Sequence, residues 1–110
     1  MSEETSGNLT EDQKKEIATS RTYEYHLDWP VEIGDTDPIL TVKLSRFNGK
    51  QIKVISKMKD QVDQMYRMIE LSSGLSEIQV EYMDSVDITN IAEICSVFMD
   101  ASQKKKTIGS

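Results

Sequence analysis

The residues best suited to chemistry in this chain are one histidine, one cysteine and several closely spaced aspartates. His26 lies between Glu24 and Asp28 in an alternating stretch. A metal site at His26 needs further ligands, and the sequence has no second histidine and no cysteine pair to supply them. We therefore interpret His26 as a surface residue and expect no metal ion and no other cofactor.

Two aspartate pairs have a spacing that acid and base catalysis can use. Asp35 and Asp37 lie in a run of turn-forming residues, and Asp84 and Asp87 precede an apolar helical pattern. Turn formation and helix capping explain both pairs without a pocket. The sequence also has no glycine-rich phosphate loop and no nucleophile elbow. We therefore expect a protein without catalytic residues.

The single cysteine, Cys95, falls on the apolar face of a predicted helix. Asp84 and Asp87 are placed to face the positive end of the helix dipole, so we expect this helix to begin near Ser85. Its main stripe consists of Ile88, Ile91, Ala92, Cys95, Phe98 and Met99. Because these residues recur at helical spacing, we interpret Cys95 as a small core residue.

The opposite face of this helix is apolar as well. Ile94, Val97 and Ala101 lie there, so a second contact is expected, either with another element of this chain or with a partner or second copy. Met65 and Met68 belong to a methionine-rich region that either fills gaps in a core or forms an adaptable binding surface. These five residues are the predicted partner-binding site.

Two strands are predicted before the helical region, because apolar and polar residues alternate there. The apolar positions are Tyr23, Tyr25, Leu27 and Trp29 in the first strand, and Leu40, Val42 and Leu44 in the second. Pro30 ends the first strand or places it at a sheet edge, and residues 34–38 are rich in turn formers. We expect an antiparallel hairpin that needs helices to cover its apolar face.

Helices are also predicted between the hairpin and the last helix. Residues 51–56 fit a strand or a helix, and we prefer a helix that enters at about Asn48 and continues, with a kink, into a helix beginning at Met58. That helix ends at Gly74, which favours a left-handed conformation. Residues 76–79 form a capping-box pattern that opens a further short helix.

These elements predict an α+β domain, an N-terminal antiparallel β-hairpin packed on a C-terminal bundle of three to four helices. We place the domain at residues 21–100. Residues 1–20 are expected to be an acidic flexible tail in which Thr10 and Gln13 support at most a short helix without a buried face. Residues 101–110 are expected to be a flexible basic tail.

Composition excludes several classes of protein. The chain has 110 residues, a net charge of −6, 37% hydrophobic and 29% charged residues. These values are ordinary for one globular domain, and the negative charge disfavours nucleic acid and anionic membranes as partners. The apolar runs are too short to cross a bilayer and the N-terminus does not have the pattern of a signal peptide, so a cytoplasmic protein is expected.

Several short motifs follow one another in a recognisable order. They are Leu27-Asp28-Trp29-Pro30, Leu44-Ser45-Arg46 with Gly49-Lys50 after it, Ile69-Glu70-Leu71-Ser72-Ser73-Gly74-Leu75-Ser76, Met83-Asp84-Ser85-Val86-Asp87 and Val97-Phe98-Met99. In their order and spacing, the segment from about Tyr23 to Asp100 resembles the tail assembly chaperones of contractile-tailed bacteriophages, the Mu-like group and its relatives.

This resemblance implies a function and a partner. It implies a non-enzymatic late protein of the infected host's cytoplasm, absent from the mature virion, that keeps the tape measure protein soluble until the tail tube forms around it. It also implies a longer product of a programmed frameshift that shares this domain, with Lys104-Lys105-Lys106 encoded by an A-rich run. Self-association is a further expectation. The alternative is a small acidic interaction module, a regulator resembling DNA in its charge, that acts on a host protein.

Overall fold

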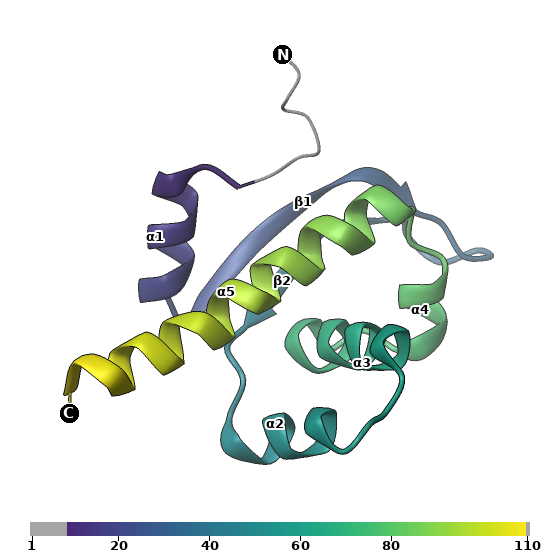
Figure 1. Cartoon of the computed structure of the whole chain (residues 1–110). Coiled ribbons are helices and arrows are strands. Elements are labelled where there is room, and N and C mark those ends of the chain that lie inside the picture. Colours follow the sequence, from purple (N-terminus) through teal and green to yellow (C-terminus); the bar gives the residue numbers. More distant parts are fainter. Residues whose placement is uncertain (1–8, 110) are drawn as a thin grey trace.

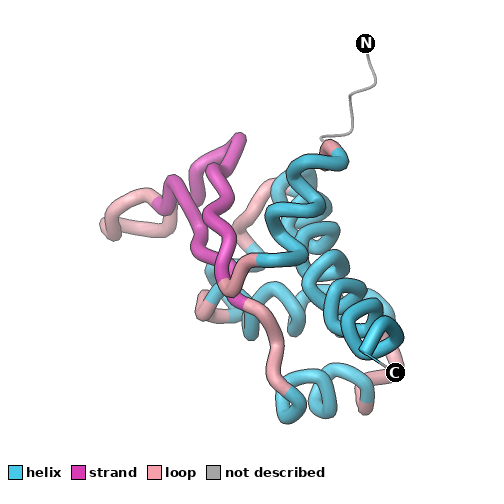
Figure 2. The backbone as a smooth tube through the Cα atoms, turned by 90° about the vertical axis from the view of Figure 1, so that its left-hand side faces the viewer, coloured by secondary structure: helices cyan, strands magenta, loops and turns pink. Residues whose placement is uncertain are grey.

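The computed structural model describes residues 9–109, with the side chains of residues 9–99. A β-hairpin lies on one side of the molecule and helices cover one of its faces (Figure 2). The last helix, α5 (Ser85–Gly109), runs diagonally across the hairpin. Helix α1 lies on one side of α5, and α3 lies on the other (Figure 1). The α+β fold expected from the sequence is confirmed.

The hairpin pairs β1 (Thr22–Val31) with β2 (Ile39–Ser45) in antiparallel register. Leu27, Val42 and Leu44 are buried on its inner face, as the alternation predicts. Pro30 lies inside β1 and does not end it, which a two-stranded sheet permits because each strand has a free edge.

The pairing is irregular between His26 and Val31, and two apolar residues near it behave differently from the prediction. Trp29, expected on the inner face, is 60% exposed, and Leu40 is 59% exposed. A break in the register shifts side chains out of strict alternation. The sequence pattern therefore predicted the burial of Trp29 and Leu40 wrongly.

Two helices follow the hairpin where one kinked helix was expected. Helix α2 (Gly49–Ser56) begins at an Asn48 capping box, which confirms a helix over residues 51–56. It ends before Met58, and α3 (Gln61–Ser73) begins anew because the Asp60 carboxylate accepts hydrogen bonds from two backbone N–H groups of its first turn. The continuous helix was therefore a wrong prediction.

The remaining predicted helix boundaries are confirmed. Gly74 ends α3 in the left-handed conformation, with φ of 79°. Ser76 and Gln79 form the capping box of α4 (Glu77–Glu81). Helix α5 begins at Ser85 as expected but continues to Gly109, past the end that the apolar stripe predicted.

Helix α1 (Glu11–Thr19) corrects the expectation of a flexible tail for this part of residues 1–20, of which residues 1–8 lie outside the described residues. The capping box of Thr10 and Gln13 is present, and α1 packs against α5. Ile17 is fully buried in the same apolar cluster as Leu44 and Phe98. The prediction failed because one buried isoleucine gives no periodic signal, although it is enough to attach a short helix to a core.

Candidate interaction site

The polar centre of the molecule is Asp87, in the first turn of α5. Its side chain is fully buried. One carboxylate oxygen accepts a hydrogen bond from the Tyr25 hydroxyl at 2.7 Å and another from the Asp28 N–H at 2.9 Å. The other oxygen accepts from the Trp29 N–H at 3.0 Å. These donors and the positive end of the helix offset the cost of burying a charge.

This cluster is structural rather than catalytic. Asn90 donates to the Tyr25 hydroxyl oxygen at 2.9 Å, so the hydroxyl is engaged on both sides. Burial, and then the bond to Asp87, raise the pKa of Tyr25 far above its usual range. The phenol therefore stays protonated and does not act as a base near neutral pH. The cluster holds the irregular part of β1 against α5.

Asp84 and Asp87 thus have different structural roles. The Asp84 carboxylate accepts from the Val86 N–H at 2.9 Å, as an N-cap does. Asp87, which the sequence placed at the helix dipole, binds a strand far away in the chain. The sequence signal identified the helix start but not this long-range contact.

A second polar contact joins α3 to the end of β2. The hydroxyl of Ser72 accepts from the Ser45 N–H at 3.1 Å and donates to the Ser45 carbonyl at 2.8 Å. Cys95 is fully buried, which confirms its assignment to the core. Burial raises the pKa of its thiol to about 12, and a hydrogen bond with Ser72 acts in the opposite direction. A protonated, buried thiol is no nucleophile.

The Arg46 side chain joins the end of α1 to α5. Its guanidinium donates to the carbonyls of Ala18 and Ser20 at 3.0 Å each, at the end of α1. It also donates to the Phe98 carbonyl at 3.2 Å and lies 5.3 Å from the centroid of the Phe98 ring. A planar group with several donors suits such carbonyls at helix ends.

The predicted partner-binding residues do not form one exposed surface. Ile94 is fully buried in the core. Val97, Met65 and Met68 are partly buried and pack against the same core. The side chain of Ala101 lies outside the described residues. Of the alternatives, contact within the chain is the one observed for Ile94, since it belongs to the core cluster. Ile94 is therefore a core residue, and binding of a partner by the predicted residues stays a prediction.

The exposed apolar side chains are other residues than the five predicted to bind a partner. Each of the following is at least 40% exposed: Trp29, Leu40, Ile52, Val54, Val62, Ile78, Tyr82 and Val86. Val62 was not among the residues that the sequence analysis singled out for binding.

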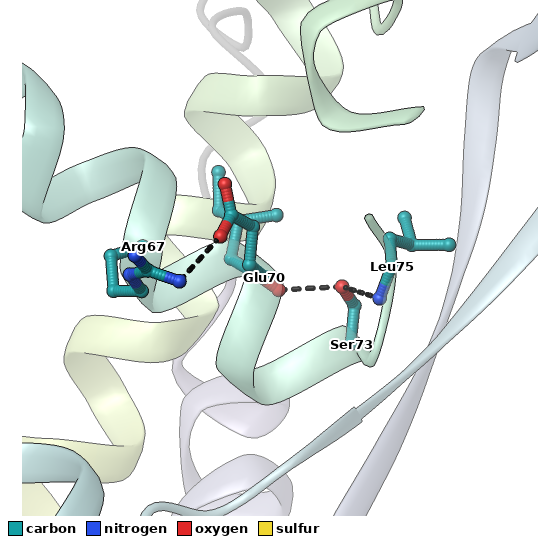
Figure 3. A network of polar contacts seen from close by, with 5 residues as sticks. Arg67, Glu70, Ser73 and Leu75 are labelled. Carbon is teal, nitrogen blue, oxygen red and sulfur yellow. Dashed lines mark hydrogen bonds and ion pairs between the residues drawn. The ribbon is translucent and has the colours of Figure 1, made fainter. Parts of the chain in front are cut away.

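A groove of about 360 Å³ runs along α3 and α4, with Met58, Val62 and Tyr66 among its lining residues. The other lining side chains are charged and come from both helices. Figure 3 shows two of them, Arg67 and Glu70, paired at 3.0 Å on α3. It also shows the Ser73 hydroxyl, which accepts from the Leu75 N–H at 3.1 Å where α3 ends.

Within the described residues, no group of three or more histidine, cysteine, aspartate or glutamate side chains could hold a metal ion. No helix among them is long and apolar enough to cross a membrane.

Residues 24–100 match the family described as phage tail assembly chaperone proteins, E, or 41 or 14. The chain belongs to this family. Neither a search of curated proteins nor a search of solved structures gave a match. The resemblance stated from the motifs is confirmed. A tail assembly chaperone acts with phage tail proteins, and a chaperone family indicates a non-enzymatic role.

The matched segment begins in β1, covers β2 and α2 to α4 and ends in α5, so α1 lies outside it. Several motif residues of this chaperone now have a structural explanation. Arg46 joins α1 to α5, Gly74 ends α3, and Asp84 and Asp87 place α5. These motif residues therefore have roles in the fold.

Proposed function

We propose that this chaperone binds the tape measure protein of its phage and keeps it soluble until the tail tube forms around it. Family membership over residues 24–100 carries the proposal. The exposed apolar side chains described above support it, because a chaperone for apolar helices needs surface that such helices can cover.

The proposal is tested by co-expression with the tape measure protein of the same phage. We expect the tape measure protein to move from the insoluble to the soluble fraction and to co-purify with the chaperone. An unrelated acidic protein of similar size is the control for a nonspecific effect of charge. A tape measure protein that remains insoluble, or is soluble without co-purifying, would contradict the proposal.

We further propose that the chaperone acts in the cytoplasm of the infected host and is absent from the mature virion. Mass spectrometry of purified particles tests this, with the tape measure protein as the internal positive signal. Finding the chaperone at a fixed ratio to tail proteins would instead indicate a structural component.

The longer frameshift product and self-association remain proposals. An A-rich heptamer over the codons of Lys104-Lys105-Lys106, with an overlapping frame, is the expected gene feature. An A-poor codon set there would exclude this frameshift site. Light scattering of the purified protein measures self-association directly.

A further inference from the structure

The groove along α3 and α4 combines apolar and acidic side chains. Val62 is 57% exposed, and Tyr66 lies one helical turn further along α3. Residues four apart project from the same side of a helix, so these two side chains form a short apolar strip. Such a strip suits contact with apolar side chains of another segment.

The charged residues around this strip are mostly acidic. The lining has four carboxylates and one guanidinium, a net charge of −3. The Arg67 guanidinium is paired with Glu70 (Figure 3). Asp63, Glu77 and Glu81 form no ion pair with any residue that the structure describes. Among the described residues, three carboxylates around this groove therefore have no positive partner.

We propose that this groove is the docking site for a positively charged amphipathic helix of the tail protein that the chaperone binds. In this arrangement apolar side chains of the partner helix contact Val62 and Tyr66. Lysine or arginine side chains of the partner helix extend to Glu77 and Glu81. The aliphatic part of such a side chain covers apolar surface while its charged group reaches outwards. The inference rests on the proposed function and adds the place and the chemistry of binding.

The test compares two variants with the same change in net charge. Glu77→Lys with Glu81→Lys reverses two carboxylates of the groove, and Glu32→Lys with Asp35→Lys reverses two exposed carboxylates beyond the end of β1. All four side chains are exposed, so both variants are expected to keep the fold, which circular dichroism checks. The probe is the tape measure protein co-expressed with each variant, followed by titration of its bound segment.

We expect the groove variant to bind about tenfold more weakly or worse, since attraction becomes repulsion at two positions, and the control to bind as the wild type does. Equal binding by both variants would overturn the groove and leave the proposed function standing. Equal weakening of both would also overturn it, because the effect would come from net charge alone. If the wild type itself does not bind, the proposed function fails, and the inference fails with it.

A second pair of variants tests the apolar strip without changing charge. Val62→Asn and Val86→Asn each replace an exposed valine in the first turn of a helix, where short polar side chains are tolerated. We expect weaker binding for Val62→Asn only. A wild type that is dimeric in solution, with Val62→Asn monomeric, would assign the groove to contact between copies and overturn the proposal.

Discussion

Asp87 shows how one residue can decide where two distant segments meet. Its carboxylate is fully buried and takes all its described hydrogen-bond donors from β1. Two of these donors are backbone N–H groups in the irregular stretch of β1, where the register with β2 is broken. The carboxylate thus replaces strand partners that the hairpin does not provide.

Asp87→Asn is expected to lower the free energy of unfolding by about 1–3 kcal/mol. The amide keeps one acceptor oxygen but turns an N–H group towards a backbone donor. Urea denaturation measures the change. Asp28→Asn, at an exposed carboxylate nearby, is the control and should change stability by less than about 0.5 kcal/mol. Equal stability of the two variants would contradict a structural role for the Asp87 charge.

The buried thiol of Cys95 predicts a loss of stability at alkaline pH. Its pKa is about 12 in the folded chain, against an ordinary value of 9.0. Between these values the unfolded chain loses the proton and the folded chain keeps it, so stability falls as pH rises, by about 1.4 kcal/mol per pH unit from this group. We expect a shallower slope above pH 9 for Cys95→Ala, measured by urea denaturation at several pH values. Equal slopes of stability against pH for the wild type and Cys95→Ala would contradict the raised pKa of Cys95.

At the scale of elements, α1 lies wholly outside the family match, which begins at residue 24. Arg46 holds the carbonyls at its end, and Ile17 reaches the common core. Helix α1 therefore contributes to the stability of the domain, although it is short and has one buried side chain.

Ile17→Ala should lower the free energy of unfolding by about 2–4 kcal/mol, because it leaves a cavity in the core. Thermal or urea denaturation measures this change. Glu16→Ala, at the neighbouring exposed position, is the matched control and should have little effect. If both variants behave alike, α1 is not attached to the core in solution.

Helix boundaries were predictable from the sequence where a local capping pattern sets them, as at Ser76 and Asp84. The break between α2 and α3 was missed, because the sequence analysis did not identify Asp60 as an N-cap. The burial of Ile94 and the exposure of Trp29 depend on contacts between segments far apart in the chain. No periodicity within a single segment contains that information.

The prediction of the candidate site failed for the same reason. Local patterns suggested Met65, Met68, Ile94 and Val97, and the structure places these four residues in or against the core. The groove depends on how α4 folds back onto α3, which brings Glu77 and Glu81 beside Val62. Sequence spacing alone does not indicate that these residues meet.

For the molecule as a whole, the net charge of −6 predicts binding that depends on salt. We expect the affinity for the tape measure protein to fall between about 0.1 M and about 1 M salt, because the screening length shrinks from about 10 Å to about 3 Å. Calorimetric titration at both concentrations measures the effect. The variant with Glu77→Lys and Glu81→Lys should show a weaker dependence. Affinity that is unchanged or increases with salt would indicate apolar contact without charge attraction.

The Arg46 contacts also constrain how the chain folds during its synthesis. Helix α1 leaves the ribosome first, but one of its partners is the segment around Phe98, which leaves much later. Ile17 therefore cannot meet the part of its core cluster that α5 supplies until that helix has been made. A chain that stops before Phe98 lacks part of this core and one carbonyl that Arg46 binds, so we expect it not to complete the fold.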